Sequence, residues 1–249
     1  MILGKRIGTG NTAEVYEWED GRVIKLFKRG YPLSAVEKEF TNAMAVSSLD
    51  FPRPVAYELI WVGERAGIVY SRAEGESLVD WVMKTGDISR CGYYLAELHK
   101  RILLHRLPEA QSYKDFLEWG IKKAWLNHAD KLKGFLEALE QLPEGDTLCH
   151  GDYHPGNVLL SEGKTSVIDF MNICRGPMLY DAARTVYLIE FTPVPEGTEN
   201  RALVMALKQK LAAAYLSEMG IARESINAFL YVITAARAGE CPAEFLPER

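Results

Sequence analysis

The residues with the clearest chemical potential lie in one short stretch, HGDYHPGNVLL, at residues 150–160. It places two histidines, an aspartate and an asparagine within eight positions. Such a cluster could hold a metal, or it could form the catalytic loop of a phosphoryl transferase. A metallophosphatase site would need an Asp-x-His before the stretch and an Asn-His after it, and the sequence supplies neither. The stretch therefore favours phosphoryl transfer.

Phosphoryl transfer assigns distinct roles to three side chains, two in this stretch and one after it. Asn157 lies five residues after Asp152, and Asp169, in the sequence VIDF, lies seventeen residues after it on the next expected strand. Transfer from a nucleotide requires Mg²⁺ held by hard oxygen ligands, which Asn157 and Asp169 provide. Asp152 would accept the proton of the acceptor hydroxyl and align that group for in-line attack. His150 and His154 are then interpreted as scaffold residues.

A second signal lies near the start of the chain, in IGTGNTAEV at residues 7–15. Its Gly8 and Gly10 fit a dinucleotide-binding turn, a loop that covers nucleotide phosphates, or a plain surface turn. A dinucleotide-binding turn requires the glycines to open a helix, whereas the following AEVYEWEDGRVIKLF is typical of a strand, a turn and a strand. This context favours a phosphate-covering loop between two strands, with a surface turn as the remaining alternative.

Lys25, in the sequence VIKLF, is the candidate cation for the phosphates. A lysine on such a strand commonly faces solvent, but its place shortly after a glycine loop matches the strand lysine that kinases direct at nucleotide phosphates. Such a lysine needs an acidic partner, and both Glu37 and Glu39 lie on the next expected helix. Each flanks the apolar stripe of that helix at a comparable angle, so periodicity leaves both open.

The elements that would position these residues form two blocks. Alternating apolar and polar residues predict strands within 3–27, 55–62 and 66–71, with a helix over 33–49 that FPRP ends. After Gly75 the sequence predicts amphipathic helices over 92–105, 112–126, 131–142, 198–218 and 223–238. A short strand is expected over 165–170. We therefore expect a two-lobed α+β fold, with an N-terminal antiparallel sheet lobe that contains one helix and a mainly helical C-terminal lobe. The expected boundaries are 1–70 for the first lobe, 71–75 for the hinge and 76–249 for the second lobe.

Composition excludes several other classes of protein. The 249 residues carry a net charge of −5, and no run of Lys and Arg is typical of nucleic-acid binding. No apolar stretch approaches a membrane span, and the first residues are too polar for a secretory signal. The four cysteines are scattered, which predicts neither a zinc motif nor a disulfide framework. We expect a cytoplasmic protein that contacts neither nucleic acid nor membrane.

Taken together, the motifs resemble a known family. IGTGNTAEVY, VIKLF, YSRAEGESL, HGDYHPGNVLL, VIDF and GPMLYDAART are similar, in this order, to the motifs of aminoglycoside phosphotransferase-like kinases, which are relatives of choline kinases and share the protein-kinase-like fold. The resemblance implies Asp152 as catalytic base, Asn157 and Asp169 as Mg²⁺ ligands, and Lys25 on the phosphates of ATP or GTP. The place of EKEF ahead of FPRP, read as the family reads it, favours Glu39 as the partner of Lys25.

The stretch YSRAEG is similar to the segment that joins the two lobes in this family. The resemblance implies that the backbone of Ser71 and Ala73 hydrogen-bonds the purine and that Tyr70 lines its pocket. The sequence departs from the pattern in two places. The first loop has only two glycines, and Met171-Asn172 follows VIDF where eukaryotic protein kinases carry a glycine. These departures concern loop geometry more than chemistry.

Two features bear on the acceptor. Residue 151 is glycine, so the arginine that a phosphorylated activation loop engages in many protein kinases is missing. Only eleven residues separate Asp169 from Asp181, which leaves little room for a peptide-docking platform, and the resemblance implies Asp181 as a structural anchor. A small hydroxyl compound fits better, with cationic aminoglycosides or amino alcohols among the candidates and antibiotic resistance as one role. An atypical protein kinase and a catalytically silent nucleotide-binding module are the alternatives. Acidic candidates for the acceptor site are Asp115, Glu118 and Glu190.

Overall fold

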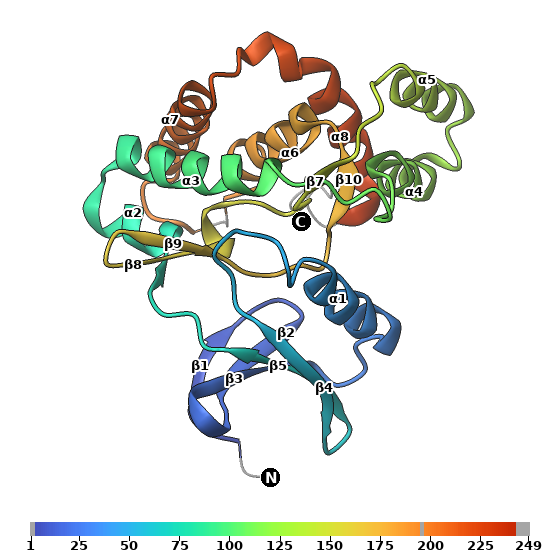
Figure 1. Cartoon of the computed structure of the whole chain (residues 1–249). Coiled ribbons are helices and arrows are strands. Elements are labelled where there is room, and N and C mark those ends of the chain that lie inside the picture. The colour runs from blue at the N-terminus through green and yellow to red at the C-terminus, as the bar shows by residue number, and fades with distance from the viewer. Residues whose placement is uncertain (1–2, 195–196, 243–249) are drawn as a thin grey trace.

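The N-terminal lobe is an antiparallel sheet with one helix packed on it (Figure 1). The computed structural model describes residues 3–194 and 197–242. The strand order is β1-β2-β3-β5-β4, and every pairing is antiparallel. The strands are β1 (Arg6–Thr9), β2 (Ala13–Glu17), β3 (Arg22–Phe27), β4 (Ala56–Val62) and β5 (Arg65–Ser71), with the 3₁₀ turn η1 (Glu19–Gly21) between β2 and β3. This is the strand lobe that the sequence predicts.

Helix α1 (Leu33–Ala45) packs against β4 and β5 and ends before the expected residue 49. The chain turns at Val46, whose side chain is fully buried and whose N–H still bonds back to Asn42 at 3.3 Å. The guanidinium of Arg53 then donates to the carbonyls of Leu49 and Phe51, both at 2.7 Å. These bonds satisfy the carbonyls of the turn that follows the helix.

Helices make up most of the C-terminal lobe (Figure 1). They are α2 (Leu78–Thr85), α3 (Ile88–Leu103), α4 (Tyr113–Trp125), α5 (Ala129–Glu140), α6 (Met178–Glu190), α7 (Arg201–Met219) and α8 (Asn227–Glu240), with the 3₁₀ turns η2 (Pro155–Asn157) and η3 (Arg223–Ile226). Helix α4 packs on α8, α3 packs on α7, and α6 packs on both α7 and α8. The two-lobed α+β fold expected from the sequence is therefore confirmed.

Two helices were not expected from the pattern. Helix α6 is buried along almost its whole length, so it lacks the polar face that makes a helix visible in a sequence. Helix α2 is only eight residues long, and local signals delimit it. The hydroxyl of Ser77 accepts the N–H of Asp80 at 3.1 Å, and Gly86 ends the helix at a φ of +69°.

Short strands between the helices hold the loops that carry the chemistry. The pair β7 (Thr147–Cys149) and β10 (Cys174–Gly176) is antiparallel, and β6 (Glu76–Ser77), β8 (Val158–Ser161) and β9 (Lys164–Val167) form a second small sheet. Glu162 and Gly163, both at positive φ, make the two-residue turn between β8 and β9. Within residues 3–194 and 197–242, no helix has both the length and the apolar character that a membrane span needs.

Candidate active site

The catalytic loop, residues 150–157, runs from the end of β7 to the start of β8, and α6 holds its first residues. The carboxylate of Asp181 on α6 accepts the N–H of His150 at 2.6 Å and the N–H of Gly151 at 2.9 Å. One helical turn later, Nε of Arg184 donates to the carbonyl of Gly151 at 2.7 Å. Donors and acceptors on two consecutive residues are thus fixed by two side chains of one helix.

Asp181 is itself fully buried and is held in its ionised form by its partners. Nε2 of His99 lies 3.0 Å from its carboxylate, and Nδ1 of His99 lies 2.6 Å from the hydroxyl of Tyr215. Burial would raise the pKa of Asp181, but the hydrogen bond from His99 and the N–H of Gly151 outweigh burial and hold that pKa below its usual value. The anchor implied for Asp181 is present in this geometry.

Arg184 is equally buried, with an exposed fraction of 1%. Its two terminal nitrogens bind the carboxylate of Glu240 on α8, at 3.0 and 2.6 Å, and its guanidinium lies over the ring of Phe116 on α4. A buried guanidinium needs such a bidentate partner. The end of α8 is therefore connected through one side chain to the carbonyl of Gly151.

Only glycine fits at position 151. The φ of Gly151 is +73°, and a Cβ built there would lie 2.2 Å from the carbonyl oxygen of Asn172. An arginine at this position, as in many protein kinases, would require both a left-handed backbone and displacement of the 172 peptide. The missing arginine is thus explained by the local packing.

Asp152 and Asn157 face each other across the loop. Nδ2 of Asn157 donates to the carbonyl of Asp152 at 2.9 Å and to its carboxylate at 3.3 Å. With the amide nitrogen used in this way, Oδ1 of Asn157 is the atom that remains as a hard ligand. The β8–β9 hairpin then places the next segment beside Asn157, because the N–H of Ile168 donates to the carbonyl of Asn157 at 3.0 Å.

The two histidines of the loop make backbone contacts. Nδ1 of His150 accepts the N–H of Asp152 at 3.3 Å, and its Nε2 lies 3.2 Å from the carbonyl of Ile168. Burial lowers the pKa of His150 below its usual value, which suits a neutral ring with one donor and one acceptor nitrogen. Nδ1 of His154 accepts the N–H of Gly156 at 3.1 Å. Both rings therefore brace the loop backbone.

Asp169 does not lie on a strand, contrary to the expectation for residues 165–170. Strand β9 ends at Val167, and the φ of Asp169 is +70°. A non-glycine residue in this left-handed region cannot continue a strand and costs about 1–3 kcal/mol, so its surroundings must hold it. The carboxylate lies 3.0 Å from Nζ of Lys25 and accepts the N–H of Met171. Burial would raise the pKa of Asp169, but the charge of Lys25 holds it below its usual value.

Lys25 lies between two carboxylates that come from different parts of the chain. Nζ of Lys25 is 2.8 Å from Oε1 of Glu39 on α1 and 3.0 Å from the carboxylate of Asp169. Burial would lower the pKa of Lys25, but the charges of Asp169 and Glu39 outweigh it and hold that pKa above its usual value. Glu37, the alternative partner, is exposed on α1. The hydroxyl of Tyr70 also donates to Oε1 of Glu39, at 3.1 Å.

The hinge offers a purine fewer groups than the sequence suggested. The N–H of Ser71 already donates to the carbonyl of Val55 at 2.8 Å, and the Ser71 hydroxyl accepts the N–H of Val55. The Ser71 N–H is therefore already used, which narrows the expected role of the Ser71 backbone to its carbonyl. Among the described residues, no hydrogen bond uses the N–H of Ala73. Tyr70 is buried and turned toward Glu39.

Gly8 lies on β1, paired with Val15, and Gly10 lies in the turn of the β1–β2 hairpin. Neither has a positive φ, and a Cβ at either position would make ordinary contacts at 3.5 Å. The N–H of Gly10 donates to the carbonyl of Ala13 at 2.8 Å, which closes the turn. The fold itself does not require glycine here, so close approach of a ligand to the backbone is a reason for glycine that the hairpin does not contradict.

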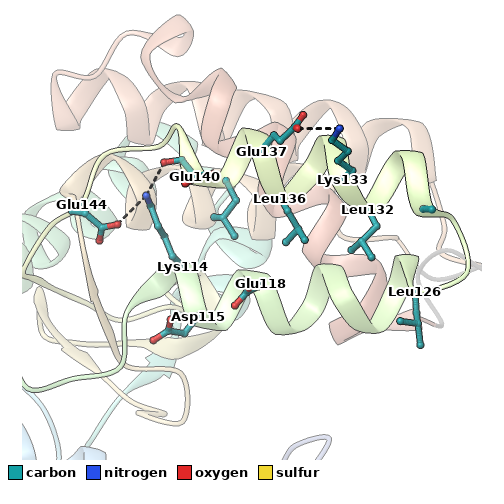
Figure 2. Close-up of a pocket in the computed structure, with 12 residues that line it drawn as sticks. Lys114, Asp115, Glu118, Leu126, Leu132, Lys133, Leu136, Glu137, Glu140 and Glu144 are labelled. Carbon is teal, nitrogen blue, oxygen red and sulfur yellow. Dashed lines mark hydrogen bonds and ion pairs between the residues drawn. The ribbon is translucent and has the colours of Figure 1, made fainter.

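The acidic candidates for the acceptor site do not come together. Asp115 and Glu118 line a groove of about 640 Å³ between α4 and α5, whose floor is formed by leucines such as Leu132 and Leu136 (Figure 2). Glu190 does not line this groove and pairs with Arg223 at 2.6 Å. The three residues therefore do not form one acidic pocket.

The donor atoms fit a magnesium nucleotide better than a metal cluster. In the part of the chain that the structure describes, no three His, Cys, Asp or Glu side chains are grouped to hold a metal. Mg²⁺ in phosphoryl transferases uses one or two protein oxygens and completes its shell with phosphates and water. Oδ1 of Asn157 and the ionised carboxylate of Asp169 are such a pair, and Lys25 supplies a fixed cation beside them.

Sequence reasoning missed the residues that hold this site from a distance. They are Asn42, His99, Arg184, Tyr215 and Glu240. The contacts through which they hold the site span between 33 and 129 positions of the chain, so no local pattern announces them. Arg184 had one signal available: it follows Asp181 by three residues, and such a pair shares one face of a helix.

The comparisons with known proteins agree with this architecture. The model of a family described as "Phosphotransferase enzyme family" matches residues 4–216. Amicoumacin kinase hAmiN, solved in complex with AMP-PNP, Ca²⁺ and Ami, is 16% identical with a TM-score of 0.61, covering 96% of this chain and 80% of that one. Aminoglycoside phosphotransferase APH(3'')-Id from Streptomyces rimosus, solved with ADP and streptomycin, is 18% identical with a TM-score of 0.58, covering 90% of each chain.

A choline/ethanolamine kinase family protein from Mesorhizobium loti is 14% identical with a TM-score of 0.55, covering 98% of this chain and 80% of that one. Among curated proteins no match was found. At these identities the solved structures show the fold.

Proposed function

We propose that this chain, which belongs to the phosphotransferase enzyme family, transfers the γ-phosphoryl group of ATP or GTP to a hydroxyl group of a small molecule. The observation that carries the proposal is the convergence of Lys25, Asp169, Asn157 and Asp152 on one site from three segments: β3, the loop after β9, and the loop at 150–157. A binding module would need the first three of these residues, but it would not need a carboxylate placed to receive a proton.

Each side chain has a part in this proposal. Lys25, held by Glu39, would bind the nucleotide phosphates, and Gly8 and Gly10 would let the backbone approach them. Asn157 and Asp169 would hold Mg²⁺, which when bound neutralises charge on the phosphates. The carbonyl of Ser71 and the N–H of Ala73 would bind the purine.

Asp152 would act on the acceptor. Its carboxylate would accept the proton of the attacking hydroxyl while the bond between that oxygen and the γ-phosphorus forms and the bond to the β-phosphate oxygen breaks, releasing ADP or GDP. Asn157 orients the carboxylate through the hydrogen bond at 3.3 Å, and Asp181 and Arg184 fix the backbone on which it stands. Positioning is the larger part of this catalysis.

A small acceptor is supported by the short segment that follows Asp169. Strand β10 and the start of α6 occupy residues 174–180, which leaves no long loop on which a peptide could lie. Hydroxyl compounds that carry amines, such as aminoglycosides and amino alcohols, head the candidates because structurally similar proteins include an enzyme solved with streptomycin and a choline/ethanolamine kinase family protein. Antibiotic resistance would be one consequence of such an activity.

The test is a screen for phosphoryl transfer. Purified protein is incubated with Mg²⁺ and either ATP or GTP, together with a panel of aminoglycosides, amino alcohols, sugars and a generic peptide substrate. We expect nucleotide consumption that depends on one small hydroxyl compound, with a phosphorylated product visible by mass spectrometry.

The matched control for this screen is Asp169→Ala, which removes a proposed Mg²⁺ ligand and should abolish both the product and the stabilisation by magnesium nucleotide. Product formed equally by wild type and by Asp169→Ala would contradict the proposed site. Phosphorylation of the peptide alone would favour a protein kinase, and nucleotide binding without any product would favour a silent binding module.

A further inference from the structure

Asn42 joins the helix of the N-terminal lobe to the segment that carries Asp169. Its Nδ2 donates to the carbonyl of Phe170 at 2.8 Å and to the carbonyl of Met171 at 3.1 Å. A carboxamide has two N–H donors, so a single side chain can serve two consecutive carbonyls. The contact spans 128 positions of the chain and crosses from α1 to the loop after β9.

This loop contains the most unusual backbone conformation of the site. Asp169 has a φ of +70°, and the two peptides that follow it must be turned so that the N–H of Met171 reaches the Asp169 carboxylate. Asn42 holds the carbonyls of Phe170 and Met171, the two residues that follow Asp169. Its bonds therefore oppose rotation of the peptides that define where the carboxylate points.

The position of Asn42 on α1 connects it with Lys25. Asn42 follows Glu39 by three residues, so both side chains leave the same face of the helix. Glu39 binds Lys25 at 2.8 Å, and Lys25 binds Asp169 at 3.0 Å. The contacts form a closed circuit in which one helix face supports both the cation for the phosphates and the carboxylate for the metal.

The turn after α1 adds a second attachment to the C-terminal lobe. The N–H of Val167, the last residue of β9, donates to the carbonyl of Pro52 at 3.0 Å. Arg53 stiffens this turn through the carbonyls of Leu49 and Phe51. The segment around Asp169 is thus attached to the N-terminal lobe on both sides of Asp169, through Val167 before it and through Phe170 and Met171 after it. Asn42 makes the second of these attachments.

We propose that Asn42 is a positioning residue that holds Asp169 in the orientation in which its carboxylate takes Mg²⁺. The proposal rests on the proposed function, in which Asp169 is a ligand of the metal that accompanies the nucleotide. Residues that orient a metal ligand commonly change metal affinity by about 10–100-fold when they are removed. Replacing Asn42 should therefore weaken the metal-dependent binding of nucleotide, an effect that is measured separately from turnover.

The experiment measures the affinity for ATP by calorimetry, once with Mg²⁺ and once with a chelator. Asn42→Leu keeps the shape of the side chain but has no donors, and we expect the gain in affinity that Mg²⁺ confers to fall about tenfold or more. The affinity without metal should stay within about twofold of wild type, because Lys25 and Glu39 are unchanged. Asn42→Gln retains both donors and should recover part of the metal-dependent gain.

Lys38→Ala is the matched control. Lys38 lies on the same helix, is exposed, and also reaches the other lobe through a 3.4 Å contact with Gln111. Its loss should leave both affinities unchanged. Melting temperatures of all variants show whether a change in binding reflects loss of the fold.

Several results would overturn the proposal. A folded Asn42→Leu protein with an unchanged metal-dependent gain would show that Asp169 is positioned without Asn42. An equal loss of affinity with and without metal, or failure of both Asn42→Leu and Asn42→Gln to fold, would assign Asn42 a structural role only. Wild-type protein without any metal-dependent gain would instead refute the proposed function, and this inference would fall with it.

Discussion

The two loops proposed to handle the phosphates are held in opposite ways. The catalytic loop, residues 150–157, is tied to α6 by Asp181 and Arg184, and its aromatic residue Tyr153 is fully buried with its hydroxyl on the carbonyl of Leu95 at 2.7 Å. The glycine loop, residues 8–12, is mostly exposed, and its backbone bonds go to its own hairpin and to Lys28, just after β3.

This difference also explains why each loop contains glycine. Gly151 is required by the protein itself, since its φ is positive and the carbonyl of Asn172 occupies the place of a Cβ. Gly10 has neither constraint. A loop that positions a reacting group is built into the core, whereas a loop that closes over a ligand stays free to move at low cost. Four predictions test this contrast.

The largest expected effect is on the reacting group of the rigid loop. Asp152→Asn removes the carboxylate but keeps the side-chain size, so turnover should fall roughly 10²–10⁴-fold while ATP affinity and melting temperature change little. Steady-state kinetics, calorimetry and thermal melting on one preparation measure the three quantities. Asp130→Asn, an equal charge change on the exposed face of α5, is the control. Retained turnover in folded Asp152→Asn would remove the catalytic assignment.

A second prediction compares the two glycines. Gly151→Ala forces an alanine into a left-handed backbone and against the carbonyl of Asn172, so the free energy of unfolding should drop by about 2 kcal/mol or more. Gly10→Ala meets only ordinary contacts and should change that free energy by less than about 0.5 kcal/mol. Urea denaturation measures both. Equal stability losses at the two positions would erase the contrast between the loops.

The third prediction concerns the ion pair that holds Lys25 within the N-terminal lobe. A double-mutant cycle with Lys25→Ala and Glu39→Ala should show a coupling energy of about 0.5–3 kcal/mol in turnover, because Glu39 acts through its 2.8 Å contact with Lys25. The same cycle with the exposed Glu37 should show additivity. Coupling of Lys25 to Glu37 alone would mean that α1 turns Glu37, and not Glu39, toward the sheet.

The smallest expected effect lies on the strand after the glycine loop. Glu14 pairs with Arg65 at 2.8 Å and Arg6 at 3.0 Å, and the hydrogen bond from Arg65 is the main cause that lowers the pKa of Glu14 below 4.5. A lowered pKa stabilises the fold above the unfolded pKa, and this stabilisation is lost as pH falls through the folded value. Glu14→Gln should therefore destabilise slightly at pH 7.

Acid or salt should abolish the difference between Glu14→Gln and wild type, because pairs at the surface are screened. Melting curves at pH 3 and pH 7, with and without about 1 M salt to screen surface charges, test this. Asp181→Asn provides the contrast, since Asp181 is fully buried and its destabilising effect at pH 7 should persist in salt. A salt-sensitive effect at Asp181 would mean that the catalytic-loop anchor is less protected than its burial indicates.

The sequence predicted the parts of the site that are local. Asp152 and Asn157 belong to one loop, and Asp169 comes two residues after the β8–β9 hairpin that follows this loop, so their spacing in the sequence keeps them close together. The strands of the N-terminal lobe and six of the helices also follow from periodicity. Glu39 could not be separated from Glu37 by periodicity, because which face of α1 meets the sheet depends on packing.

What the sequence could not predict depends on contacts between distant segments. Helix α6 escaped detection because its residues are buried on all sides. The bonds of Asn42 to the Phe170 carbonyl and of Arg184 to Glu240 exist only once both lobes and α8 are in place. The positive φ of Asp169 is imposed by the same assembly, which is why VIDF alone reads as a strand.

The β8–β9 hairpin has a consequence for how such sites vary among chains. Asn157 and Asp169 are brought together by the pairing of Val158 with Val167, and the Glu162-Gly163 turn only reverses the chain. Lengthening both strands by the same even number of residues would preserve the side-chain faces and the register, and would leave the two proposed ligands adjacent. A single inserted residue in one strand would shift every following side chain to the opposite face. Relatives of this chain can therefore keep the proposed ligand pair together at other sequence separations, as long as the added residues come in matched pairs across the hairpin.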